Sequence, residues 1–112
     1  MGCFLLPWCV LLFLTLPATT HAEHWSLAWT GLDGAEAVAA LATAALLTRS
    51  DPRAGLTAAA GGAFLVTDAW FDVCTSAPGL GQCLAVSEAI FVELPLAAAA
   101  FWLAAKLIQD RR

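Results

Sequence analysis

The stretch WSLAWTGLDGAEAVAALATAALL, residues 25–47, decides the fold class of this chain. Its length matches the about 20 mostly apolar residues that an α-helix needs to cross a bilayer. Asp33 and Glu36 interrupt the apolar run, and no Lys or Arg accompanies them. Ionisable groups inside such a segment are costly in lipid and commonly mark a functional site. The stretch therefore predicts a transmembrane helix whose acids belong to a functional site.

Three further apolar segments flank this one, at about residues 3–18, 55–74 and 84–108. The composition agrees with a membrane protein, because 61% of the 112 residues are hydrophobic and 12% are charged. Soluble domains carry about 25% charged residues. We therefore expect an all-α fold, a four-helix transmembrane bundle that forms a single integral membrane domain over residues 1–112.

The first segment has two interpretations. It is short for a span, and residues 20–22 loosely fit the small-residue cleavage site of a signal peptide. However, Met1 is not followed by the positively charged region that begins such signals. A retained helix is favoured, with a cleaved signal as the alternative.

The basic residues predict the orientation, because cytoplasmic loops near span ends are enriched in Lys and Arg. Two of the five lie in the loop between the second and third segments, and three lie at the C-terminal end. They are Arg49, Arg53, Lys106, Arg111 and Arg112. We expect a multi-pass protein of the plasma membrane with cytoplasmic N- and C-termini, and loops 19–24 and 75–83 on the outer side.

Small residues recur at helical spacing and predict close packing of the spans. The second segment carries one such stripe, and the third carries another with two small residues beside it. The stripes are Gly31, Ala35 and Ala39, then Gly55, Ala59 and Ala63, with Ala58 and Gly62 adjacent. An Ala-rich composition also produces such spacings by chance.

Six acids lie in the apolar segments, and they form the candidate ion or proton site. They are Asp33, Glu36, Asp68, Asp72, Glu88 and Glu93. Counting about 1.5 Å per residue from the outer ends places all six in the outer half or at the centre of the membrane. On this count Asp33, Asp68 and Glu88 share a depth, Asp72 lies nearer the surface, and Glu36 and Glu93 lie near the midplane. Pairs three or four apart share a helix face, whereas Glu88 and Glu93, five apart, point to different faces.

Two functions fit this acidic cluster. Without cations nearby the carboxyls cannot all stay ionised in a low-dielectric site, so protons or a bound cation must balance them. One hypothesis is polar glue in a structural or interaction protein, with the acids hydrogen-bonded to Trp N–H groups or to Thr30, Thr43, Thr67 or Ser87. The other is a proton- or cation-coupled carrier or oligomeric channel. Pro95 frees the carbonyl of Phe91 and predicts a kink beside Glu93.

The cysteines and histidines provide weaker signals. Cys74 and Cys83 flank the outer turn, where an oxidising compartment permits a disulfide, so we predict one. Their spacing is not the C-x-x-C of a redox centre, and a membrane thiol oxidoreductase is a weak enzyme candidate. Residues 21–24, HAEH, contain ligand types that zinc accepts, with Asp72 as a further ligand, but the spacing matches no metal motif. A solvated loop is the favoured interpretation.

No sequence feature predicts a cofactor or a catalytic constellation. The absence of a basic stripe excludes nucleic-acid binding from the expected functions. The expected partners are the lipid bilayer and a second copy of the chain or another membrane protein.

Three blocks of this sequence resemble a family of small, uncharacterised, multi-pass membrane proteins of actinobacteria. They are AWTGLDGAEA (28–37), TDAWFDVCTSAPG (67–79) and AIFVELPLAA (89–98). The resemblance covers most of the chain and implies a bacterial protein with four spans and a retained first segment. It implies no activity, substrate or cofactor. The residues that match its motifs are Asp33, Glu36, Asp68, Trp70, Asp72, Glu93 and Pro95, whereas the Cys74–Cys83 pair is not part of the pattern.

Overall fold

The computed structural model describes residues 2–110, which form helices and connecting segments and include no strand. The all-α prediction is confirmed. The elements are α1 (Gly2–Thr15), α2 (Trp25–Thr48), α3 (Ala54–Thr75), α4 (Leu80–Glu88), the π-helical turn η1 (Ala89–Glu93) and α5 (Leu94–Asp110). The last three form one continuous helix of 31 residues. Arg111 and Arg112, on which the predicted orientation partly depends, lie outside the described residues.

The turn between α2 and α3 is closed by one ion pair. The guanidinium of Arg53 donates to Asp51 Oδ2 at 2.7 Å, and the Arg53 backbone N–H donates to Asp51 Oδ1 at 2.9 Å. These hydrogen bonds favour the ionised carboxylate and lower the pKa of Asp51 to about 2. Pro52 follows, and α3 begins two residues later. The break therefore falls where the sequence predicts it.

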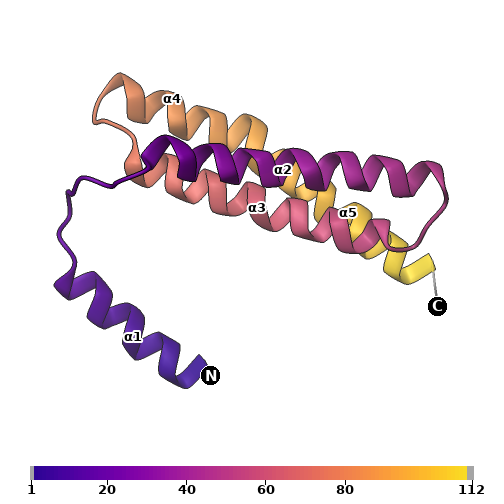
Figure 1. Cartoon of the computed structure of the whole chain (residues 1–112), viewed down its shortest axis with the longest axis horizontal. Coiled ribbons are helices and arrows are strands. Elements are labelled where there is room, and N and C mark those ends of the chain that lie inside the picture. Colours follow the sequence, from indigo (N-terminus) through magenta and orange to yellow (C-terminus); the bar gives the residue numbers. More distant parts are fainter. Residues whose placement is uncertain (1, 111–112) are drawn as a thin grey trace.

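Helix α3 is the central element of the arrangement (Figure 1). Helices α2 and α5 each pack along α3 and not on each other, while α4 and η1 pack on its C-terminal half. The structure thus contains three packed helices, and α3 is the one that contacts both of the others. Any side chain of α3 that faces both neighbours is common to two interfaces.

The interface between α3 and α5 is made by small residues. Gly55, Ala58 and Gly62 are buried on α3, and a Cβ at Gly62 would lie 2.8 Å from the ring of Phe101. The predicted stripe is therefore displaced, because Ala63 is exposed. Small residues occupy two adjacent rows of α3, and the sequence alone does not show which row packs against α5. The structure shows that it is the row with Ala58 and Gly62.

Helix α1 stands apart from the other helices (Figure 1). It contains no buried residue, and it packs against none of α2 to α5. Its large side chains, such as Phe4, Leu6 and Phe13, are exposed. The predicted packing of four helices is thus not present in the structure, because the segment 16–24 leads α1 away from the other three.

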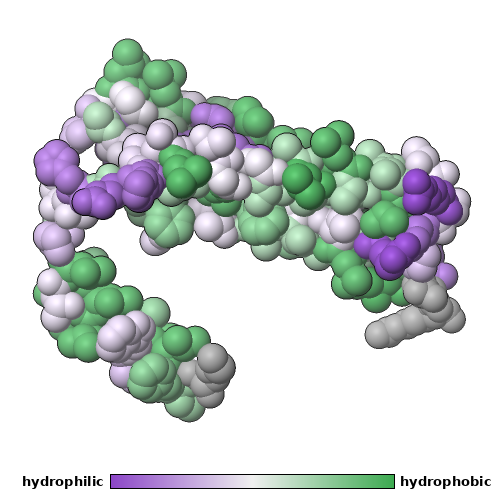
Figure 2. Space-filling view, viewed as in Figure 1, coloured by the Kyte–Doolittle hydropathy of each residue, from purple (hydrophilic) through white to green (hydrophobic). Residues whose placement is uncertain are grey.

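The distribution of side-chain size is opposite to that of a soluble helical protein. The buried apolar side chains are all Ala, whereas the large apolar ones point outward, among them Leu41, Leu56, Trp70, Phe91 and Trp102. Figure 2 shows hydrophobic surface along the helices and hydrophilic surface mainly near their ends. Small residues inside and large apolar ones outside fit a bilayer, where lipid covers the exposed surface.

Two helical segments are long and apolar enough to cross a membrane, by length and composition. They are Trp25–Thr48 and Leu80–Asp110. Helix α1 is apolar but has 14 residues, and α3 is not among the two candidates. These two segments support a membrane location at the level of length and composition, and the structure does not by itself establish four spans.

Candidate functional site

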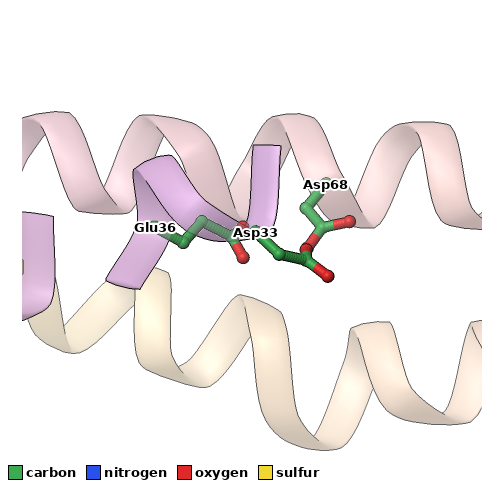
Figure 3. A group of neighbouring side chains, drawn as sticks. All are labelled: Asp33, Glu36 and Asp68. Atoms are coloured by element: carbon green, nitrogen blue, oxygen red, sulfur yellow. The ribbon is translucent and has the colours of Figure 1, made fainter. Parts of the chain in front are cut away.

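Five of the six predicted acids converge between α2, α3 and η1. They form two groups, and within each group one carboxyl oxygen from every member lies within 4.8 Å of the others. The first group contains Asp33 and Glu36 of α2 with Asp68 of α3, as drawn in Figure 3. The second group contains Asp68 and Asp72 of α3 with Glu93 of η1. Asp68 belongs to both groups, because α3 packs against both other elements.

The acids of the cluster differ in burial. Asp68 retains 8% of its exposure and Glu93 retains 5%. Glu36 and Asp72 are partly buried, and Asp33 is exposed. The cluster therefore runs from an open edge at Asp33 to a closed end at Glu93. A ligand that reaches Glu93 must be coordinated there by protein oxygens.

No hydroxyl, indole or basic side chain among residues 2–110 donates a hydrogen bond to these five carboxyls, whose side-chain hydrogen bonds are to other acids, Glu36 with Asp68 and Glu93 with Glu88. Thr67 donates to the Ala63 carbonyl at 2.8 Å, and Thr43 donates to Thr57 at 2.8 Å. Glu36 Oε1 and Glu93 Oε2 are buried and have no hydrogen-bond partner. The donors expected from the sequence are thus used elsewhere or make no bond to the acids.

No basic side chain balances the cluster either. Within the described range the single ion pair is that between Arg53 and Asp51, in the loop at the other end of α2 and α3. Five acids consequently share one region with neither a hydroxyl or indole donor nor a cation in contact. Balance by protons or by a bound cation is what this arrangement requires.

The position of Glu93 depends on the π-helical turn. The Leu94 N–H bonds to the Ala89 carbonyl, five residues back, in place of the usual four. Pro95 lies two residues after the end of this turn and has no N–H to donate to Phe91, as expected. The inserted residue leaves Glu93 buried, and π-turns of this kind occur frequently at functional sites. Pro95 was the sequence signal for this irregularity, but its form was not predicted.

Glu88 is the predicted acid that the structure leaves out of both groups. It is exposed and lies at the end of α4, one π-turn before Glu93. The sequence predicts different faces for these two residues, and their exposures differ, but the π-turn brings their carboxyls within hydrogen-bonding reach of each other. Glu88 is therefore a neighbour of the second group and not a member of it.

The structure brings the carboxyls of Asp72 and Glu93 closer together than their predicted depths suggest. Counting residues separates them by about 10 Å, whereas their oxygens lie within 4.8 Å. The continuous helix starts at Leu80, before the expected residue 84, and α4 diverges from α3 toward the connecting turn (Figure 1). Helices with different tilts and starting levels cannot be compared by a residue count.

The cysteines and histidines do not form the sites considered for them. Cys74 and Cys83 are exposed free thiols in the structure, so the predicted disulfide is not formed there. They lie in the last turn of α3 and the first turn of α4. Neither His21 nor His24 joins the two acidic groups, which are the sets of potential metal ligands in the described part of the chain.

An apolar groove extends from the cluster between α2 and α5. It encloses about 610 Å³, and Asp33 and Glu36 line one end while Leu47 lines the other. Fourteen residues of α2 separate Asp33 from Leu47, which corresponds to about 21 Å. Thr43 and Thr57 line its middle part. The sequence did not predict this groove, because it follows from α2 and α5 packing on α3 without packing on each other.

Comparison of the chain with protein-family models, with curated proteins and with solved structures found no match. The cluster is therefore interpreted from its own geometry.

Proposed function

We propose that this chain is a multi-pass membrane protein that handles protons or cations at the carboxyl cluster between α2, α3 and η1. The observation that carries the proposal is Glu93, a buried acid with an unpaired oxygen that meets Asp68 and Asp72. Acids that serve only as polar glue would be expected to accept hydrogen bonds from neighbouring helices. Here they meet other acids, and an exchangeable positive charge is the simplest way to balance them.

The membrane arrangement follows the sequence prediction. In this proposal α1 to α5 supply four spans, both termini are cytoplasmic, and the cluster opens to the outer side. Supporting it are the exposed large apolar side chains and the position of Arg49 and Arg53 at the opposite end from the acids. Membership of the actinobacterial family that the sequence resembles belongs to the same proposal.

In this proposal the groove is the path by which an ion leaves the cluster. Its lining is apolar apart from the two acids, Thr43 and Thr57, so water must enter the groove for an ion to pass. It leads from Asp33 and Glu36 to Leu47 near the inner end of α2. Its open side is completed by lipid in a single copy, or by a helix of a second copy in an oligomeric channel. A small carrier and a channel subunit are both consistent with this geometry, and they share the acids as the essential groups.

A structural or interaction role is the second candidate, and α1 favours it. This apolar helix has no partner within the described structure, so another membrane protein or a second copy can cover it. In that case substitution of the cluster acids changes stability or assembly and leaves ion flux unaffected.

Flux measurements on reconstituted vesicles test the proposal. Vesicles that contain a pH-sensitive dye receive a proton gradient alone or with opposing gradients of Na⁺, K⁺ or Mn²⁺. We expect wild-type flux to exceed that of protein-free vesicles, and Asp68→Asn to reduce the excess at least tenfold. Asp110→Asn, which alters an exposed acid at the far end of α5, is expected to retain it. Absence of flux under every gradient, or equal flux in wild type and Asp68→Asn, would refute the proposal.

A further inference from the structure

The second acidic group has the composition of a site for a hard divalent cation. Its three members offer carboxylate oxygens and no nitrogen or sulfur. Ca²⁺, Mg²⁺ and Mn²⁺ prefer such ligands, whereas zinc sites usually include His or Cys. The residue types therefore select the chemical class of the ion.

The spacing of the oxygens also suits a common ion. Ca²⁺ binds oxygen at about 2.3–2.6 Å, so two ligands on opposite sides of it are about 4.6–5.2 Å apart. The three oxygens of Asp68, Asp72 and Glu93 all lie within 4.8 Å of one another. Asp68 and Asp72 are one helical turn apart on α3, and Glu93 approaches from the π-turn. One ion can contact all three without rearrangement of the backbone.

A buried, unpartnered oxygen points to a ligand independently of the clustering. Glu93 is 5% exposed, its Oε2 has no hydrogen-bond partner, and one of its carboxyl oxygens lies within 4.8 Å of oxygens of Asp68 and Asp72. Leaving a buried acceptor unsatisfied is unfavourable. A proton satisfies one carboxyl, whereas a divalent cation contacts and balances several at once.

We propose that Asp68, Asp72 and Glu93 bind a divalent cation of the Ca²⁺ or Mn²⁺ type, which is then the coupling ion of the transport proposed above. This inference rests on the proposed function and narrows its ion class. Asp33 and Glu36 complete a second group around the same Asp68. An ion that leaves the Glu93 side therefore meets further carboxylates in the direction of the groove.

Binding of Mn²⁺ to the purified protein in detergent tests the proposal. Electron paramagnetic resonance of free Mn²⁺ during titration gives the number bound and the dissociation constant. We expect about one high-affinity Mn²⁺ per chain, displaced by Ca²⁺. Glu93→Gln and Asp72→Asn should each weaken binding at least tenfold, whereas Asp110→Asn, which alters an exposed acid at the far end of α5, should not change it.

Circular dichroism shows whether each variant is folded. If Glu93→Gln does not fold, Glu93→Asp is used instead. This variant keeps the charge but has a side chain shorter by one methylene, so weaker binding is again expected. If substitutions of Glu93 and Asp72 leave Mn²⁺ binding unchanged, the ion binds only to exposed acids elsewhere on the protein, and the proposal is overturned. Absence of Mn²⁺ binding together with Asp68-dependent proton flux would overturn this inference and leave the proposed function intact.

Discussion

Replacing Gly62 by Ala tests whether α3 and α5 pack as closely as the structure describes. A Cβ at this position would lie 2.8 Å from Cε1 and 2.9 Å from Cζ of Phe101. Carbon atoms in favourable contact are about 3.5–4.0 Å apart. Either the Phe101 ring must turn away or α5 must move outward.

The expected cost can be worked from these contacts. Overpacking of a close interface costs about 1–3 kcal/mol, and the lower half of that range applies because Phe101 can turn; its residue is 42% exposed. An Ala that replaces Gly inside a helix recovers up to about 1 kcal/mol. The net loss in the free energy of unfolding should therefore be about 0–1 kcal/mol.

Gly61 provides a matched control one residue away. A Cβ there would meet the Cβ of Ala39 at 3.5 Å, an ordinary contact on the α2 side. Gly61→Ala should therefore gain up to about 1 kcal/mol from helix propensity alone. The two single variants are expected to differ by about 1–2 kcal/mol.

Unfolding in mild detergent by increasing SDS, followed by circular dichroism and Trp fluorescence, measures the difference. Adding Phe101→Leu to Gly62→Ala should restore most of the lost stability, because it removes the ring atoms in conflict. If Gly62→Ala is as stable as Gly61→Ala, or if Phe101→Leu does not rescue it, the close α3–α5 contact is wrong.

Two further predictions concern the loops. Because Arg53 lowers the pKa of Asp51, the ionised carboxylate stabilises the fold at pH values above the pKa of the unfolded state, and this contribution is lost as the pH falls from about 4 toward about 2. Asp51→Asn should therefore weaken the dependence of unfolding on pH in that range. An unchanged profile would contradict the Arg53 contact. After reduction, Cys74 and Cys83 should react with a membrane-impermeant maleimide added outside intact cells, whereas a Ser50→Cys reporter in a Cys74→Ser, Cys83→Ser background should not. Reversed labelling would invert the orientation, and a gel shift that requires reductant would demonstrate the Cys74–Cys83 disulfide.

The apolar periodicity predicted the helices well, because segments of about 20 apolar residues leave the backbone few alternatives to helix. The breaks at Pro52 and at Pro78-Gly79 also fall where predicted, between α2 and α3 and between α3 and α4. The detachment of α1 could not be foreseen, since its sequence satisfies the apolar pattern whether or not it packs.

Within the site, helical spacing predicted the contacts between acids of one helix more accurately than those between acids of different helices. Asp33, Glu36, Asp68 and Asp72 pair by helical spacing, and the structure brings them together. The approach of Glu93 to Asp72 depends on the tilt of α4 and on the π-turn before Pro95, and the residue count did not predict it. Neither property is encoded in residue spacing on a single helix.

The division of the acids between two interfaces links packing to function. The Asp68–Asp72–Glu93 group is carried by α3 and the helix that contains η1, which are held close by Gly62 and Phe101. The group with Asp33 and Glu36 depends instead on the α2–α3 interface. Gly62→Ala should therefore disturb ligands of the proposed cation site while leaving the α2 acids in place, and Gly61→Ala should spare both. Weaker Mn²⁺ binding in Gly62→Ala alone would indicate that the small residues of α3 also set the distance between the ligands.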